Sequence, residues 1–560
     1  MADLPDTDEA ALQSFVHARH HQIFPMLAPE QIEVMARYGE RRRFGAGQVL
    51  FRQGERHIAC YVIIDGLIEI ERSNAIRSRV IGTFGHGMFT GDVGTLAGRA
   101  AVASARTATE CDLIVIEEES LRALVITEAD LSEIIMRAYI LRRVAFIQDK
   151  DGGGLVIFGS HRSAHALTLR EFLARNAQPA AYFDIDQHEA ARPLMERFGI
   201  TPDDIPAVVT PGGTVLKKPS NRAVADAMGI SPDNLNGRQF DLAVVGAGPA
   251  GLAAAVYGAS EGLNVVVLDT KAAGGQAGTS SRIENYFGFP TGISGVALAG
   301  RGLSQARKFG AEVAVPFEVR EMACNGAGNP FDLELDNGDR IRARAVVIAS
   351  GARYRKPSIP DLDRYEGRGI YYNASYMEAT FCSRSDVIIV GGGNSAGQAA
   401  VFLSGHARRV HIMVRSEGLA SSMSQYLIQR IRAAANITLH PRTQIVGLQG
   451  DDKLQRVLCR TGDEPPRAFD VEHVFLFLGA EPNTGWLGDC VRLDDKAFVL
   501  TDVHVPADAW PLERRPYHLE TSQPGVFAVG DVRSGSVKRV AAAVGEGASA
   551  VQALHQFLAE

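Results

Sequence analysis

Two glycine-rich segments, each directly after an apolar run, could bind the phosphates of a dinucleotide. The first consists of Gly246, Ala247, Gly248, Pro249, Ala250 and Gly251. In such a segment the first glycine permits a tight turn, the second admits a pyrophosphate to the backbone, and the third lets the next helix pack on the strand. The following apolar run, 264–268, ends in Asp269, whose carboxylate suits a ribose hydroxyl pair. We therefore predict a dinucleotide site at 246–251 and Asp269.

The second glycine-rich segment follows the apolar run 386–390. It consists of Gly391, Gly392, Gly393, Asn394, Ser395 and Ala396. An alanine in the last position is compatible with the same kind of phosphate loop. The next run, 410–414, ends in Arg415 where the first site has an acidic residue. A cation there suits the 2′-phosphate of NADPH, so the spacing favours NADPH over NADH.

These segments need strands and helices to position them, and the 560-residue chain is long enough for several domains. Polar linkers that carry Gly or Pro are expected at 149–154 and 231–238. Residues 1–148 hold short alternating apolar stretches broken by glycine, which predicts an antiparallel β-roll with flanking helices. Residues 154–230 alternate strand and helix, which predicts a small α/β domain. The rest predicts two Rossmann-like α/β modules, one formed by 239–354 with 476–560 and the other, 355–475, inserted into it.

Composition excludes several classes of partner. The formal charge of −7 argues against nucleic acid as the main partner, because phosphate backbones bind to clustered Lys and Arg. No apolar run reaches the length of a membrane span, and the acidic amino terminus lacks the features of a signal peptide, so we expect a cytoplasmic protein. The six cysteines are scattered and form no Cys-x-x-Cys pair, which indicates neither a disulfide framework nor a metal site.

From about residue 240 to the end, the chain resembles the low-molecular-weight thioredoxin reductase family. The motifs that carry the resemblance are Gly246–Gly251, Gly274–Gln276, Glu284–Tyr286, Gly391–Ala396, Gly479–Thr484, Gly530–Asp531 and Gly545–Gly547. The resemblance implies a homodimer that binds FAD in the first Rossmann module and NAD(P)H in the inserted one. The FAD contacts that it implies are Gly275, Gln276, Asn285, Gly530, Asp531 at the ribityl chain, and Lys538, Arg539 and Val540 at the pyrimidine edge of the flavin.

The family's redox-active Cys-x-x-Cys is missing from this chain. Counting back from Gly391 places Ala374 and Met377 at the two cysteine positions and Glu378 at the aspartate that follows them, whereas an alternative alignment places Asn373 and Tyr376 there. Neither alignment supplies a thiol, and the nearest cysteine, Cys382, is single. Met377 could cover the flavin and Glu378 could donate a proton, with a helix-surface carboxylate as the alternative for Glu378.

The nicotinamide loop also departs from the family, because Arg415 is the one cation left of the several that family members use for the 2′-phosphate. NADH use therefore stays open. We predict an FAD-dependent NAD(P)H oxidoreductase that passes electrons to an external acceptor, either a small molecule or a protein. The alternatives are a non-catalytic redox sensor and a reductase controlled by a cyclic nucleotide.

Residues 18–145 resemble the cyclic nucleotide-binding domain of the catabolite-activator type. The resemblance rests on motifs at 44–47, 51–55, 61–66 and 89–92. It implies a carboxylate for the ribose and an arginine for the cyclic phosphate, for which Asp92 and Arg99 are the candidates, although one alignment places Ala101 at the arginine position. No helix-turn-helix follows, so DNA is not an expected partner.

The middle segment resembles a glutaredoxin or thioredoxin. Serines stand at Ser160 and Ser163, where that family has cysteines, and Ile205-Pro206 would be its cis proline. Hydroxyl groups cannot carry out thiol exchange. We therefore expect a docking or spacer domain, with His161 and His165 on its surface.

Overall fold

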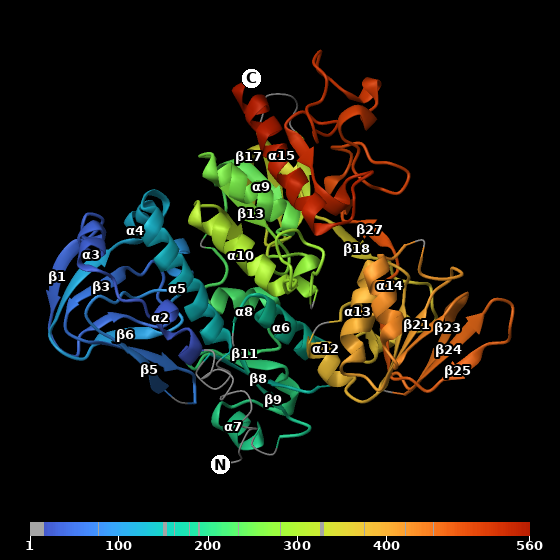
Figure 1. The fold of residues 1–560 in the computed structure, drawn as a ribbon, viewed down its shortest axis with the longest axis horizontal. Coiled ribbons are helices and arrows are strands. Elements are labelled where there is room, and N and C mark those ends of the chain that lie inside the picture. Colours follow the sequence, from blue (N-terminus) through green and yellow to red (C-terminus); the bar gives the residue numbers. More distant parts are fainter. Residues whose placement is uncertain are drawn as a thin grey trace.

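The structure, a computed structural model, has four modules that follow one another along the chain except for one insertion (Figure 1). They are the β-roll module (16–148), the middle module (154–230), the first Rossmann module (239–354 with 476–560) and the inserted module (355–475). The structure describes residues 16–560 apart from 77, 149–153, 162, 179, 189–190, 233, 281, 325–329, 375, 421 and 452, and it does not describe the side chains of residues 147, 148, 376 and 377.

The β-roll module has two antiparallel sheets whose apolar side chains face each other. One sheet has the order β1-β7-β3 and the other β2-β6-β4-β5. The strands are β1 (Glu40–Phe44), β2 (Val49–Phe51), β3 (Cys60–Asp65), β4 (Ile68–Ser73), β5 (Ser78–Phe84), β6 (Ser104–Thr107) and β7 (Cys111–Ile116). The helices are α2 (His20–Ile23), α3 (Pro29–Ala36), η1 (Thr95–Ala97), α4 (Glu118–Thr127) and α5 (Ala129–Gln148). The predicted roll with flanking helices is confirmed.

The middle module is a four-stranded sheet of order β11-β10-β8-β9 with three helices. Its elements are β8 (Leu155–Gly159), α6 (Ala164–Arg175), β9 (Ala180–Asp184), α7 (Ala191–Arg197), η2 (Pro202–Asp204), β10 (Ala207–Val209), β11 (Val215–Lys217) and α8 (Asn221–Ala227). β8 and β9 are parallel, whereas β10 is antiparallel to both β8 and β11. The predicted cis peptide at Ile205–Pro206 is present.

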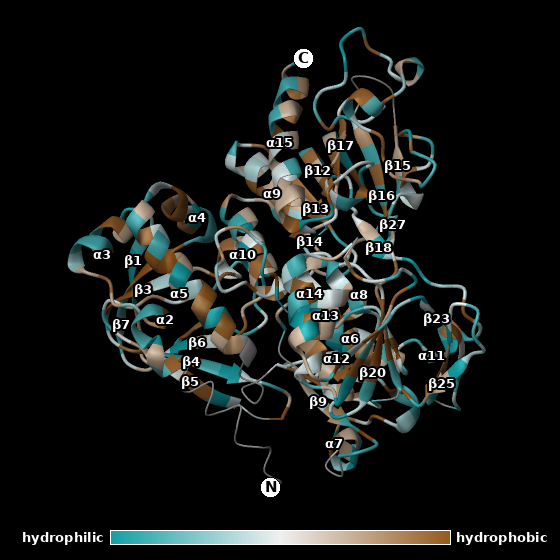
Figure 2. Cartoon of the chain, turned by 45° about the vertical axis from the view of Figure 1, so that its right-hand side comes forward, coloured by the Kyte–Doolittle hydropathy of each residue, from teal (hydrophilic) through white to brown (hydrophobic). Residues whose placement is uncertain are grey.

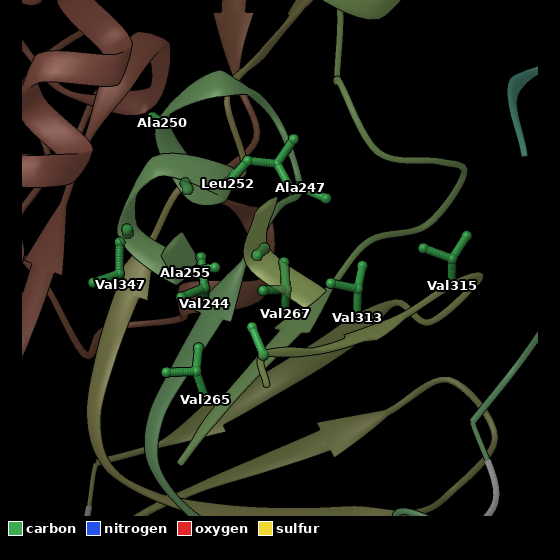
Figure 3. Close-up of a cluster of buried hydrophobic side chains, with 14 of the residues drawn as sticks. Val244, Ala247, Ala250, Leu252, Ala255, Val265, Val267, Val313, Val315 and Val347 are labelled. Atoms are coloured by element: carbon green, nitrogen blue, oxygen red, sulfur yellow. The ribbon is translucent and has the colours of Figure 1, made fainter. Parts of the chain in front are cut away.

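The first Rossmann module is built on a seven-stranded sheet of order β14-β13-β12-β17-β16-β15, with β28 paired to β17. Its strands are β12 (Gln239–Val245), β13 (Val265–Leu268), β14 (Glu312–Ala314), β15 (Val319–Ala323), β16 (Phe331–Leu335), β17 (Arg340–Ile348) and β28 (Val526–Ala528). Parallel strands buried on both faces explain the apolar run at 241–245. Valines of neighbouring strands pack beneath α9, as Val244, Val267 and Val347 show in Figure 3.

Helices cover this sheet, and short one-turn helices lie in its loops. They are η3 (Ala277–Thr279), α9 (Pro249–Ser260), α10 (Gly295–Lys308), η4 (Gly485–Leu487), η5 (Asp502–His504), η6 (Ala507–Ala509), η7 (Gly530–Val532) and α15 (Val540–Ala559). A disulfide joins Cys324, just after β15, to Cys490, just after η4. The spacing of the cysteines, which indicated no disulfide framework, did not predict this bond. The two residues are 166 positions apart, so their spacing gave no signal.

The inserted module has a parallel five-stranded sheet of order β19-β26-β20-β21-β22 beside a small antiparallel sheet of β23, β24 and β25. Its strands are β19 (Ile370–Tyr371), β20 (Asp386–Val390), β21 (Arg409–Met413), β22 (Ile437–His440), β23 (Thr443–Gln449), β24 (Arg456–Thr461), β25 (Arg467–Phe469) and β26 (His473–Leu476). Its helices are α11 (Leu362–Tyr365), α12 (Tyr376–Phe381), α13 (Asn394–Ser404) and α14 (Gln425–Ala433). The antiparallel pair β18 (Ala352–Tyr354) and β27 (Ala480–Pro482) connects it to the first Rossmann module.

The middle module contacts both Rossmann modules through α6. The Arg175 side chain, at the end of α6, donates a hydrogen bond to the carbonyl oxygen of Gly275 at 3.0 Å. At the start of α6, Ala164 lies against Gly367 of the inserted module. Figure 2 shows the strands β12 and β20 in hydrophobic colours inside their modules. Among the described residues, no helix has the length and apolar character needed to cross a membrane.

Candidate functional site

The first glycine-rich loop runs from β12 to α9 and has no room for side chains at its outer glycines. Gly246 has a φ of 110°, and a Cβ there would lie 2.2 Å from the carbonyl oxygen of Ala349. A Cβ on Gly251 would lie 1.9 Å from the carbonyl oxygen of Gly246. Gly248 is the N-cap of α9, and a Cβ on Gly275 would lie 3.0 Å from its Cα. The bare backbone of the loop and of Gly275 is thus open to a phosphate at the start of the helix.

Asp269 is fixed at this loop by backbone groups. Its Oδ2 accepts a hydrogen bond from the backbone N–H of Ala247 at 2.9 Å. Its Oδ1 accepts from the N–H groups of Lys271 and Ala272 at 2.9 and 3.1 Å. A carboxylate offers about four acceptor sites, so Oδ2 retains one for a ligand. The position is that predicted for a ribose-binding carboxylate.

The Gly530-Asp531 turn lies against the same loop. A Cβ on Gly530 would lie 3.0 Å from the Cβ of Ala250, and one on Gly547 of α15 would lie 2.1 Å from the Ala250 carbonyl oxygen. Glu546 holds the turn, because its carboxylate accepts a hydrogen bond from the N–H of Gly530 at 2.6 Å. Three motifs that lie far apart in the sequence therefore meet around Ala250, next to Pro249, the first residue of α9.

Asp531 and Lys538 are both partly buried at this turn. Burial raises the pKa of Asp531; the charge of Lys538 opposes the rise and that of Glu546 adds to it. Burial also lowers the pKa of Lys538, against the charges of Asp531 and Glu546. The Lys538 ammonium donates to the backbone carbonyl of Asp531 at 2.6 Å, so it faces the turn. Arg539 is the N-cap of α15 and Val540 is its first residue.

Gln276 and Asn285 lie on the exposed side of the site. The Gln276 amide donates a hydrogen bond to the carbonyl of Ala352, on the connecting strand β18. Asn285 is exposed, and its neighbour Glu284 forms an ion pair with Arg430 of α14 at 2.6 Å. Both predicted residues are therefore next to contacts between the first Rossmann module and the inserted module.

The second glycine-rich loop runs from β20 to α13. Gly391 has a φ of 140°, and a Cβ there would lie 2.4 Å from the carbonyl oxygen of Phe477, whereas a Cβ on Gly393 would meet no atom within 4 Å. Asn394 fixes the loop, because its Oδ1 accepts from the N–H of Ser424 at 2.8 Å. Ala396 is buried. Arg415 is exposed after β21, and it forms no ion pair within the described part of the chain.

Tyr354, which sequence reasoning missed, links the two loops. It lies on the connecting strand β18, and its ring packs edge-on against Phe477 at 5.5 Å between centroids. Burial raises the pKa of Tyr354; the neighbouring Ser395 side chain opposes the rise and the charge of Asp531 adds to it. The start of α13 in the inserted module thus faces the Asp531 turn of the first Rossmann module across Tyr354.

α12, which carries Met377 and Glu378, lies beside α6 of the middle module in both Figure 1 and Figure 2. Glu378 is 7% exposed, so it is not a helix-surface carboxylate. The Met377 side chain lies outside the described part of the structure. Burial raises the pKa of Cys382 to about 11, which suits a structural thiol.

Asp92 and Arg99 have partners other than a shared ligand in the roll. The Asp92 carboxylate forms an ion pair with Arg143 of α5 at 3.1 Å. The Arg99 guanidinium donates to the carbonyl oxygen of Val313, on β14 of the first Rossmann module, at 2.9 Å. The inside of the roll is packed with apolar side chains such as those of Phe51 and Ile63. Arg99 therefore faces the neighbouring module.

The two serines of the middle module have structural partners. The Ser160 hydroxyl donates to the carboxylate of Asp186 at 2.6 Å, and Ser163 caps α6 by accepting from a backbone N–H at 3.2 Å. His161 is exposed and lies 3.0 Å from the carboxylate of Asp184, and His165 is exposed as well. The expectation that both histidines lie on the surface is confirmed.

Comparison with known proteins agrees with this geometry. Residues 240–547 match the family "Pyridine nucleotide-disulphide oxidoreductase", and residues 41–128 match the family "Cyclic nucleotide-binding domain". Thioredoxin reductase of Mycoplasma genitalium is 32% identical over 314 residues, which are 56% of this chain and 93% of the relative. Thioredoxin reductase of Mycolicibacterium smegmatis is 32% identical over 323 residues, which are 57% of this chain and 97% of the relative.

Two solved structures resemble the same part of the chain. The crystal structure of T. acidophilum thioredoxin reductase aligns with a TM-score of 0.52 at 29% identity, over 58% of this chain and all of that one. Lactococcus lactis thioredoxin reductase, described as in the FR conformation, aligns with a TM-score of 0.52 at 28% identity, over 57% of this chain and 99% of that one.

Proposed function

Because the chain belongs to the pyridine nucleotide-disulphide oxidoreductase family, we propose that it is an FAD-dependent NAD(P)H oxidoreductase that passes its electrons to an external acceptor. The observation that carries the proposal is the meeting of three motifs around Ala250, with the second glycine-rich loop facing them across Tyr354. Bound FAD would accept a hydride from the nicotinamide and give up the electron pair to the acceptor.

The residues of the first loop fit FAD. A pyrophosphate needs close access to backbone N–H groups, and the Gly248–Gly275 approach leaves that access open at the positive end of α9. Asp269 keeps one acceptor site for a ribose hydroxyl pair. Asp531 lies at the turn predicted to bind the ribityl chain, and Lys538 places its charge beside that turn.

The inserted module would bind NADPH at the start of α13. Gly393 gives open backbone for the pyrophosphate, and Arg415 is an exposed cation without an ion-pair partner among the described residues. The 2′-phosphate would supply that partner, which is the reason to favour NADPH. Because Arg415 is a single cation, we expect the preference over NADH to be moderate.

The chain has no dithiol where electrons would leave the flavin. α12 carries no cysteine, Cys382 is single and buried, and the disulfide of Cys324 lies at the β15 edge of the sheet. The acceptor is therefore external by this proposal. A protein disulfide, a quinone, an iron–sulfur protein or oxygen are the chemical classes that can take the electron pair.

An anaerobic titration with NADPH tests the proposal. We expect uptake equal to the capacity of one flavin, about two electrons per FAD. Uptake of about four electrons would contradict an external acceptor and show that a disulfide of this chain accepts electrons from the flavin. Cys490→Ser is the control, because it removes the Cys324 disulfide and leaves α12 unchanged. Turnover is then measured with quinone, ferricyanide, disulfide and oxygen as acceptors. If none of them stimulates NADPH oxidation, the proposed oxidoreductase activity is contradicted.

A further inference from the structure

A cleft of about 300 Å³ lies where the β-roll module meets the first Rossmann module. Its walls come from η1 and α4 of the roll, from the linker after the middle module, and from the end of α10 and β14. The basic residues that line it are Arg56, His57, Arg99, Arg122, Arg238 and Arg307. Two carboxylates, Glu118 and Glu312, line it as well.

The two carboxylates are already paired. Glu118 forms an ion pair with Arg122, and its carboxylate lies 2.8 Å from a ring nitrogen of His57. Glu312 forms an ion pair with Arg238 at 2.6 Å. These groups therefore balance one another and add little net charge to the cleft.

Arg99 and Arg307 have no such balance. Neither forms an ion pair within the described residues, and Arg99 makes one hydrogen bond, to the backbone of Val313. The pKa of Arg99 lies well below its usual value, first because of burial and then because of the neighbouring charges of Arg307, Arg143 and Arg56, which the charge of Glu312 opposes. Burial and then the charge of Arg143 lower the pKa of Arg307 to about 10, against the charge of Asp92. Two half-buried cations of like sign are costly unless an anion joins them.

We propose that this cleft binds a small molecule that carries a phosphate or pyrophosphate group, with Arg99 and Arg307 as its anion ligands. Guanidinium groups bind phosphate oxygens through paired N–H donors, and two of them suit a ligand with two negative charges. The volume is at the lower end of the range for small-molecule sites. Apolar side chains beside the arginines, such as Leu96 and Ile230, offer a surface for an organic part of the ligand.

Such a ligand would join two modules, because Arg99 belongs to the β-roll and Arg307 to α10. The modules already touch at this place, where Lys308 of α10 donates to the hydroxyl of Ser132 at 3.0 Å. α10 also packs against α9, whose start forms the first phosphate loop. A ligand in the cleft would therefore contact α10, the helix that packs against α9 beside the dinucleotide site. This inference goes beyond the proposed reductase activity and does not depend on it.

Calorimetric titration of the full chain with inorganic pyrophosphate, at constant ionic strength, tests the proposal. With saturating NADP⁺ present to occupy the second glycine-rich loop, we expect one site in the native protein and a dissociation constant raised at least about tenfold in Arg307→Met, because a charge-assisted contact is lost. Arg320→Met is the matched control, since Arg320 is exposed on β15 at the opposite edge of the sheet from β14. It should bind pyrophosphate as the native protein does.

Two results would overturn the proposal: no binding to the native chain, or equal binding by the native chain and Arg307→Met. Circular dichroism and FAD content show whether the variant has folded. If it has not, Arg307→Lys replaces it, which keeps the charge and removes the paired donors, and binding as strong as that of the native chain would overturn the proposal. Titration of the native chain and of Arg307→Met with cyclic AMP shows whether that nucleotide binds in the cleft or inside the β-roll. A ligand held in the cleft must lose affinity in Arg307→Met, whereas one held inside the roll must not.

Discussion

The two glycine-rich loops have the same strand–loop–helix plan, and two of the differences between them affect how each can hold a ligand. The third small residue is Gly251 in the first loop and Ala396 in the second. A Cβ on Gly251 would lie 1.9 Å from a backbone oxygen, whereas Ala396 already carries a Cβ and is fully buried. The helix α9 therefore packs more tightly on its loop than α13 does.

The residue that ends the next strand also differs. Asp269 makes three hydrogen bonds to the backbone around the first loop, while Arg415 is exposed and makes no ion pair with a described residue. The charged group at the first loop, Asp269, is therefore fixed by hydrogen bonds to the protein backbone. The charged group at the second loop, Arg415, is available to a ligand. This difference suits a resident flavin in the first Rossmann module and an exchanging coenzyme in the inserted module.

Gly251→Ala should give the largest effect. The added Cβ meets the carbonyl oxygen of Gly246, which is backbone and cannot move aside without opening the loop. We expect a loss of about 3 kcal/mol or more in the free energy of unfolding and protein without FAD. Thermal unfolding and absorbance at the flavin band measure both.

The control for that change is Gly300→Ala on α10. A Cβ there would meet nothing within 4 Å, so the variant should keep FAD and gain up to about 1 kcal/mol from helix propensity. A yellow, fully stable Gly251→Ala protein would contradict the tight packing of α9 on its loop.

Arg415→Ala should have an intermediate effect, restricted to one coenzyme. Loss of a charge-assisted contact to the 2′-phosphate should raise KM for NADPH about 10- to 100-fold and leave KM for NADH unchanged. Steady-state kinetics with both coenzymes measure the split. An equal change for NADPH and NADH would show that Arg415 does not contact the 2′-phosphate.

The sequence predicts the local parts of this site well. Strand β20 has the predicted bounds, and β13 begins one residue after the start of the predicted run 264–268. An apolar run, a glycine-rich turn and a second apolar run all lie within about 30 residues of one another in such a unit. A phosphate loop can therefore be predicted from a short stretch of sequence. The cis bond before Pro206 is likewise part of a local motif.

The long-range parts could not be predicted. Arg99 and Val313 are 214 residues apart, and the cysteines of the disulfide are 166 apart. Tyr354 has no motif of its own, and its importance comes from the connecting strand that brings it to Ser395. The surroundings of α12 depend on how the inserted module lies against the middle module, which no spacing in the sequence encodes.

Asp531→Asn should give the smallest effect, and its sign depends on pH. Burial raises the pKa of Asp531 in the folded state, so the ionised carboxylate costs stability once the pH rises through that pKa. Below the ordinary pKa of an aspartate, the side chain at this position is neutral in both proteins. The variant and the native protein should then unfold at the same temperature. At pH 8 the FAD-free variant should unfold at a slightly higher temperature, by about 2 °C or less. Thermal unfolding of the two FAD-free proteins between pH 4 and 8 measures the difference. If the difference in unfolding temperature is the same at every pH in this range, the Asp531 carboxyl is well solvated. The turn that carries it would then be as open to solvent as the second loop.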